Sequence, residues 1–205
     1  MSVAAPLDWP RILTPAEVAT IRSVIDLPRL RTLFDVMLYT GMRYAELRQL
    51  RDDPARFDEE RGTIAILTRG KKQRTVVLGD RGREAVTEFV GRGAQMPAGT
   101  TNWKVHLVRW SKIARLPPHP DPPAGTSPGN PAGIGVTSTR TTWESWLYAL
   151  HPEWLRPIMA SQGRGKTKDI TRYGTLSWSA DDLEAMRLET AGWEPLHLQI
   201  GRAHV

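Results

Sequence analysis

The segment 163–174 (GRGKTKDITRYG) surrounds one tyrosine, Tyr173, with basic side chains. A phenol has an ordinary pKa of about 10 and is therefore a poor nucleophile at neutral pH. Guanidinium and ammonium groups placed around it point to phosphoryl transfer as the chemistry that it could perform. The competing interpretation is an amphipathic tyrosine on a basic surface, which is the commoner case. The basic residues of the segment are Arg164, Lys166, Lys168 and Arg172.

The composition of the chain favours a polyanionic partner. Its 205 residues include 28 Lys and Arg against 22 Asp and Glu, which gives a formal net charge of +6. That balance suits a nucleic acid better than an acidic small molecule. The lack of cysteine excludes disulfides, thiolate metal sites and a cysteine nucleophile. No apolar run is long enough to predict a membrane span, and we expect a cytoplasmic protein.

Apolar residues at a spacing of three and four predict a largely helical chain. Thr14, Pro15 and Glu17 form a typical helix start, in which Thr14 is the N-cap and Glu17 completes a capping box. Ser179 and Asp182 indicate another capped start near the end of the chain. Helices are expected at about 15–25, 28–39, 42–50, 80–90, 103–116, 138–150, 153–160, 168–173 and 179–190.

Two short β-branched runs interrupt the helical pattern. Residues 63–67 and 75–78 have strand composition, and the seven residues between them are strongly basic. This arrangement predicts an antiparallel hairpin with a basic tip, which is explained equally well by a DNA contact or by a solvated turn. The expected fold class is mainly α with a small antiparallel β-sheet.

The chain is expected to form one domain, over residues 13–193, because its length suits a single core. Seven of the fifteen residues in 117–131 are proline, so 117–134 is predicted to be an extended surface loop within that domain. Residues 1–12 are expected to be a short N-terminal extension. The last six residues, 200–205, resemble the translated end of a sequencing adapter and are left out of the fold argument.

Four segments, in order, resemble motifs of the tyrosine recombinase (phage integrase) family. TGMRYAEL at 40–47 resembles the first arginine box, and ILTRGKKQRTVVL at 66–78 resembles the hairpin that follows it. GVTSTRTTWESWL at 135–147 resembles the second arginine box, and SQGR at 161–164 resembles the end of the third. The second half of the chain is most similar to integrases of archaeal viruses and mobile elements.

This resemblance implies an enzyme that cleaves and rejoins duplex DNA. Arg43 and Arg140 match the arginines that hold the scissile phosphate, and Tyr173 matches the nucleophile. Its attack would leave a 3′-phosphotyrosine and a free 5′-hydroxyl. Arg164 matches a further phosphate contact, and Glu46 fits an acid that supports an arginine or, equally, a solvated helix residue. Neither a cofactor nor a metal is implied.

The resemblance also implies DNA contacts and self-association on DNA, from dimer to tetramer. Where the family has a hairpin lysine that protonates the leaving oxygen, this chain has Arg69, with Lys71 and Lys72 two and three residues on as candidates for the same role. Further DNA contacts are expected from Lys72, Arg74, Thr137, Lys166, Lys168 and Arg172.

Three substitutions depart from the family pattern. Arg69 replaces the hairpin lysine, Thr137 replaces a histidine or lysine, and Arg164 replaces a histidine or tryptophan. An arginine seldom releases its proton, so these changes keep a second interpretation open, namely a degenerate relative that binds DNA without cleaving it. A helical nucleic-acid-binding regulator of other ancestry is the third.

Overall fold

The computed structural model describes residues 11–67, 73–120, 127–153, 173 and 176–194. Within these ranges the chain is mainly helical and has one small sheet. In chain order its elements are α1 (Pro15–Ser23), α2 (Pro28–Tyr39), α3 (Tyr44–Asp52), the 3-10 turn η1 (Pro54–Arg56), β1 (Phe57–Asp58), β2 (Thr63–Leu67), β3 (Gln73–Val77), α4 (Asp80–Gly91), α5 (Thr100–Ile113), α6 (Ser138–Leu150) and α9 (Ala180–Glu189).

The two capped helix starts form as the sequence predicted. The Thr14 hydroxyl accepts the backbone N–H of Glu17 at 3.2 Å, and the Glu17 carboxylate accepts the N–H of Thr14 at 3.1 Å. Ser179 and Asp182 form the same reciprocal pair at the start of α9. Each pair satisfies two backbone donors that a helix start otherwise leaves without partners.

The predicted hairpin is present as β2 and β3, which pair antiparallel with Ile64 opposite Val76. The alternating side chains of Ile64 and Ile66 are buried, and this alternation fixes the register. A third strand, β1, extends the sheet on the other side of β2 to the order β1-β2-β3. It has only two residues, too few to produce a periodic pattern in the sequence. The hairpin tip, 68–72, lies outside the described residues.

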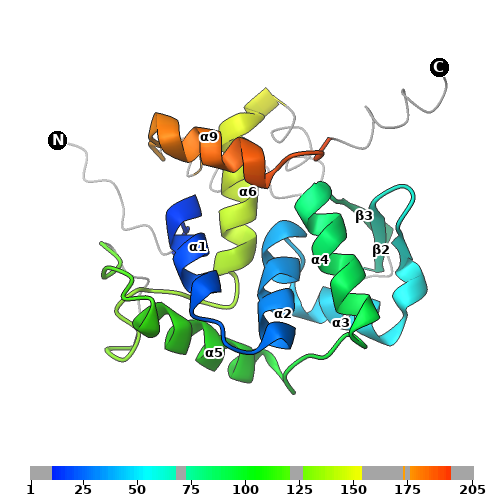
Figure 1. Cartoon of the computed structure of the whole chain (residues 1–205), viewed down its shortest axis with the longest axis horizontal. Coiled ribbons are helices and arrows are strands. Elements are labelled where there is room, and N and C mark those ends of the chain that lie inside the picture. Colours follow the sequence, from blue (N-terminus) through cyan, green and yellow to red (C-terminus); the bar gives the residue numbers. More distant parts are fainter. Residues whose placement is uncertain (1–10, 68–72, 121–126, 154–172, 174–175, 195–205) are drawn as a thin grey trace.

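Helix α6 lies at the centre of the helical packing. Figure 1 shows it between α1 and α2, with α9 crossing over one end and α5 beneath α1 and α2. The indole N–H of Trp146 donates to the carbonyl of Leu13 at 3.0 Å, and the N–H of Leu13 donates to the Thr142 hydroxyl at 2.9 Å. Helix α6 packs on α2 and on α9, so the second predicted arginine box is held by helices from both halves of the chain.

Helices α3 and α5 differ most from their predicted bounds. Helix α3 begins at Tyr44 instead of residue 42, because Arg43 is its N-cap with an extended backbone (φ −75°, ψ 152°). Helix α5 begins at residue 100 and ends at Ile113, and Arg115 just beyond it has a positive φ of 52°. On α5, Val105 is 61% exposed, whereas Trp103 and Trp110 of the same helix are buried.

None of the helices in the described ranges is long and apolar enough to cross a membrane. The helix expected at 153–160 lies outside the described residues apart from Glu153, and the one expected at 168–173 apart from Tyr173. The proline-rich stretch has no helix at 117–120 or at 127–134, as predicted.

Candidate active site

The turn that presents Arg43 is fixed against α6. Gly41 has a positive φ of 58°, and a Cβ atom there would lie 2.9 Å from Cδ1 of Trp143. The Thr40 hydroxyl donates to the carbonyl of Val36 at 2.6 Å and accepts the N–H of Met42 at 3.1 Å. Glycine is required by both the left-handed backbone and the close approach of the indole. The turn therefore places the first arginine box directly beside the second.

Glu46 is the central carboxylate of the first box. Its Oε2 accepts the backbone N–H of Arg43 at 2.8 Å and a guanidinium N–H of Arg74 at 2.6 Å. Only 6% of its side chain is exposed. Burial alone would raise the pKa of Glu46, but the hydrogen bonds from Arg74 and the Arg43 backbone, with the charges of Arg74 and Arg140, lower it below its ordinary value. The carboxylate thus stays ionised and ties α3 to β3.

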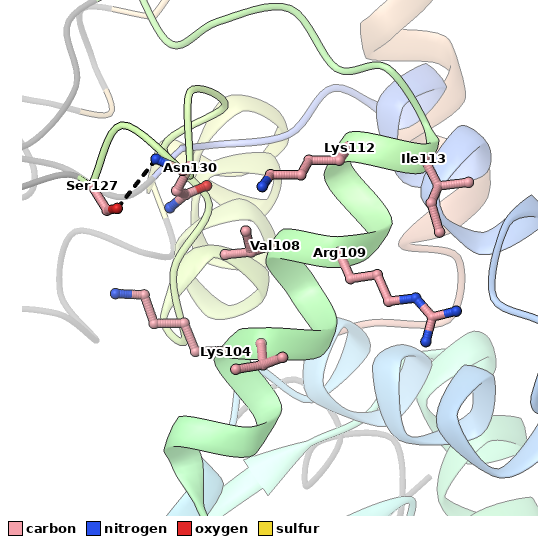
Figure 2. A pocket seen from close by; sticks show the side chains of 9 residues that line it. Lys104, Val108, Arg109, Lys112, Ile113, Ser127 and Asn130 are labelled. Atoms are coloured by element: carbon pink, nitrogen blue, oxygen red, sulfur yellow. Dashed lines mark hydrogen bonds between the residues drawn. The ribbon is translucent and has the colours of Figure 1, made fainter.

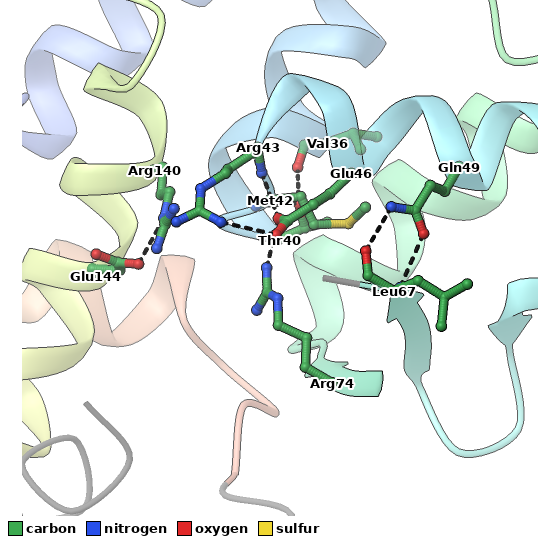
Figure 3. A network of polar contacts seen from close by, with 10 residues as sticks. All are labelled: Val36, Thr40, Met42, Arg43, Glu46, Gln49, Leu67, Arg74, Arg140 and Glu144. Atoms are coloured by element: carbon green, nitrogen blue, oxygen red, sulfur yellow. Dashed lines mark hydrogen bonds and ion pairs between the residues drawn. The ribbon is translucent and has the colours of Figure 1, made fainter. Parts of the chain in front are cut away.

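Arg43 itself remains largely open to solvent. Its side chain is 57% exposed, and its ion pair with Glu46 is long at 3.5 Å. Figure 3 shows its guanidinium pointing toward that of Arg140 on α6. Two guanidinium groups that converge in this way can bind the oxygens of one phosphate group.

The hairpin is attached to α3 by Gln49. Its amide N–H donates to the carbonyl of Leu67 at 2.8 Å, and its amide oxygen accepts the N–H of Leu67 at 3.0 Å (Figure 3). Leu67 is the last residue of β2, so this pair of hydrogen bonds fixes the strand at the point where the basic tip begins. Arg69, Lys71 and Lys72 follow directly but lie outside the described residues.

The second box brings a cation and a phenol to one carboxylate. Nε of Arg140 donates to Oε1 of Glu144 at 2.8 Å, and the hydroxyl of Tyr173 donates to Oε2 of the same residue at 3.0 Å. Arg140 and Glu144 are one turn apart on α6, whereas Tyr173 comes from a distant part of the chain. Two of the residues matched to the family's reaction therefore lie within hydrogen-bond reach of a shared group.

Tyr173 is buried in this arrangement. Its side chain is 5% exposed, and its ring lies 5.9 Å from that of Tyr148, centroid to centroid, at 41°. Helix α9, which follows it, is held to α2 by the Tyr39 hydroxyl, which donates to Glu189 at 2.5 Å. Burial is the main cause that raises the pKa of Tyr39, followed by this hydrogen bond to Glu189. Tyr39 is therefore a neutral structural donor.

The remaining predicted site residues are placed as follows. Thr137 is the exposed N-cap of α6, where its side chain makes no capping bond. Arg74 is 22% exposed and paired with Glu46, so its guanidinium supports the first box in this structure. Outside the described residues lie Arg164, Lys166, Lys168 and Arg172, together with the three hairpin residues named above.

Sequence reasoning missed two functional neighbours of these residues, Glu144 and Gln49. The signal for Glu144 was present, because a glutamate four residues after an arginine faces the same side of a helix. Nothing in the local sequence marks Gln49 as the partner of a strand backbone. Within the described residues, no group of three His, Asp or Glu side chains could hold a metal ion.

A pocket of about 590 Å³ lies elsewhere, between α5 and the loop at 127–130. Figure 2 shows Lys104, Lys112 and Asn130 around it. None of the residues matched to the reaction lines it. The candidate site is therefore the open arginine cluster between α3, α6 and β3.

Part of the chain matches a known protein family. Residues 11–105 match the phage integrase family. The match covers the first arginine box and the hairpin, and just under half of the 205 residues. A search of curated proteins found no significant match.

Solved structures similar to this chain are recombinases and integrases. XerA recombinase superimposes with a TM-score of 0.59 at 15% identity, over 92% of this chain and 66% of that one. The Tn1549 transposon integrase in complex with circular intermediate DNA gives 0.56 at 16% identity, over 91% and 68%. The integrase from mycobacterium phage Brujita gives 0.54 at 14%, over 89% and 65%. The chain thus has the fold of tyrosine recombinase catalytic domains and spans slightly less than two thirds of XerA.

Proposed function

We propose that the protein is a tyrosine recombinase that cleaves and rejoins duplex DNA at specific sites through Tyr173. The observation that carries this proposal is the meeting of the Arg140 guanidinium and the Tyr173 hydroxyl at Glu144, with Arg43 pointing toward Arg140. The fold and the family match of residues 11–105 support it.

In this proposal the two arginines neutralise the scissile phosphate. Guanidinium groups bind non-bridging oxygens through paired N–H donors and stabilise the charge of a pentacoordinate transition state. The Tyr173 oxygen attacks phosphorus, the bond to the 5′-oxygen breaks, and a 3′-phosphotyrosine conserves the energy of the broken bond. The later attack of a 5′-hydroxyl reverses these steps, so no external energy source is needed.

The other assigned roles remain part of the same proposal. Arg164 adds a phosphate contact, Arg69 occupies the sequence position of the family's hairpin lysine, and Lys71 or Lys72 supplies the proton of the leaving oxygen. DNA contacts come from Lys72, Arg74, Thr137, Lys166, Lys168 and Arg172. We place the catalytic domain at residues 13–193, with association into dimers or tetramers on cytoplasmic DNA, and an origin in an archaeal virus or mobile element.

A nicked duplex that traps the covalent intermediate tests the proposal. We expect wild-type protein to form a complex with DNA that resists detergent, and Tyr173→Phe to form none while it binds DNA nearly as well. The substitution removes only one oxygen atom, so we expect the variant to fold. A circular dichroism melt of both proteins checks this.

Two results would contradict the assignment. A covalent complex of Tyr173→Phe at the wild-type level would move the nucleophile to another residue. DNA binding by both proteins with no covalent product from either would favour the degenerate DNA-binding relative.

A further inference from the structure

Glu144 contacts both side chains on which the proposed reaction depends. It accepts one hydrogen bond from Arg140 and one from the Tyr173 hydroxyl, each on a different carboxylate oxygen. We propose that Glu144 is the general base that takes the phenolic proton of Tyr173, and that it also orients Arg140. This inference rests on the recombinase function proposed above and adds a catalytic residue to it.

The hydrogen bond to Glu144 uses a single donor of the Arg140 guanidinium. The carboxylate binds Arg140 through Nε, which carries one of the five N–H donors of a guanidinium. The other four donors are on the two terminal nitrogens, and these form the paired contacts that phosphate oxygens prefer. Glu144 can therefore fix the plane of the guanidinium without replacing the phosphate.

The distance and burial of the phenol suit proton transfer. A general base must lie about 2.6 to 3.2 Å from the atom that loses the proton, and Oε2 of Glu144 lies 3.0 Å from the Tyr173 oxygen. The phenol is buried and the carboxylate is 21% exposed. Limited access of water strengthens the hydrogen bond between them.

The other carboxylate of the site cannot perform this step. Glu46 is engaged by the Arg43 backbone and by Arg74, and its lowered pKa makes it a weaker base. Figure 3 shows Arg140 on the same helix as Glu144 and, across from it, the charged side chains of Arg43, Glu46 and Arg74.

The step balances without any further reactant. The O–H bond of Tyr173 breaks and its proton moves to Oε2 of Glu144, while the phenolic oxygen bonds to phosphorus. The bond from phosphorus to the 5′-oxygen breaks, and its electron pair leaves with that oxygen, which takes its proton from the hairpin lysine of the proposed function. On rejoining, the phenolate leaves phosphorus and recovers its proton from Glu144.

A substrate with sulfur in place of the bridging 5′-oxygen isolates this proton transfer, because a thiolate leaves without protonation. The probe is a pool of duplexes randomised around one such linkage, and the readout is the single-turnover rate of attachment at Tyr173. We expect Glu144→Gln to lower that rate on the order of 10²- to 10⁴-fold. Glutamine keeps the shape and can still accept from Arg140, but it cannot take a proton.

The pH profile separates a base from a merely structural group. Between about pH 6 and about pH 9 the wild-type rate should be nearly constant, whereas that of Glu144→Gln should rise about tenfold per pH unit, because the phenol must then ionise first. Glu144→Asp, which keeps a carboxylate, should retain the flat profile at a reduced rate. Glu184→Gln, on the exposed face of α9, serves as the matched control.

Each outcome decides the question. Attachment by Glu144→Gln within threefold of wild type, or with the same flat profile, overturns the role of Glu144 and leaves the recombinase function standing. If the wild-type protein attaches to DNA and Glu144→Gln shows the predicted losses, both the recombinase function and the base role of Glu144 are supported. No attachment by wild-type protein overturns the proposed function and this inference together. If Glu144→Gln does not fold, a steep pH profile for Glu144→Asp overturns the base role and a flat one supports it.

Discussion

Two glutamates follow the two arginines of the site by about one helical turn, and their carboxylates are used differently. Glu46 binds a backbone N–H and the guanidinium of Arg74, and leaves Arg43 largely exposed. Glu144 binds the guanidinium of Arg140, which is 10% exposed, and the hydroxyl of Tyr173. The Glu46 carboxylate holds α3 to β3, whereas the Glu144 carboxylate connects two groups that can react. Glutamates at similar spacing from an arginine thus have different roles. Glu46 pairs with Arg74 in a structural contact, and Glu144 pairs with Arg140 at the proposed reaction site.

The largest expected effect is on the rate of DNA cleavage. Arg140→Ala and Arg43→Ala should each lower it on the order of 10²- to 10³-fold, about the loss of one oxyanion donor. Arg140→Ala should also lower the stability of the protein more than Arg43→Ala does, because only Arg140 is buried and closely paired. Single-turnover cleavage and thermal melts of both variants measure the two effects. Equal losses of DNA affinity and of rate would mean that these arginines only bind DNA.

The next effect is on stability and is specific to Glu46. Glu46→Ala should cost about 2 to 4 kcal/mol, because it removes a helix cap and leaves the partly buried Arg74 unpaired. The matched Glu144→Ala should cost less, about 1 to 2 kcal/mol, since its carboxylate is more exposed and caps no helix, although Arg140 and Tyr173 lose their hydrogen bonds to it. Urea unfolding of the two variants provides the comparison. A greater loss for Glu144→Ala would reverse the roles assigned to the two residues.

Acid should reveal the same difference. Because the pKa of Glu46 is lowered in the folded protein, its stabilisation is complete above the ordinary carboxyl value and is lost as the pH falls through the lowered value. The stability of wild-type protein should therefore fall below about pH 4.5 more steeply than that of Glu46→Gln. Urea titrations at a series of pH values measure both slopes. Parallel slopes would exclude Glu46 as the source.

The smallest effect concerns DNA binding at the first box. Arg43→Gln should reduce the slope of log affinity against log salt by about 0.9, the value for one neutralised phosphate. Arg74→Gln should reduce it by less than about half of that, because Glu46 already neutralises Arg74. Fluorescence anisotropy at several salt concentrations distinguishes the two. Equal reductions would show that Arg74 exchanges Glu46 for DNA when the complex forms, as the sequence interpretation had assigned it.

The sequence by itself determined the elements that depend on local rules. Capping residues placed the starts of α1 and α9, and periodic apolar residues placed α2 and α6 with the bounds that the structure has. Alternating β-branched residues placed the hairpin. The two-residue β1 is too short for such a rule, so no local pattern marked it as a strand.

Only the tertiary structure decided which partners each charged residue has. Sequence matching assigned Arg43, Arg140 and Tyr173 to one reaction, but it did not show that Glu144 would join the last two. The spacing of Arg140 and Glu144 on one helix face is local, whereas their contact with Tyr173 depends on how the chain returns to α6. Arg74 shows the same limit, because its basic neighbours in the hairpin suggest DNA while its guanidinium packs against a carboxylate of α3. Ion pairs and hydrogen bonds form only between groups a few ångströms apart in space, and the distance between two residues along the chain does not fix that separation.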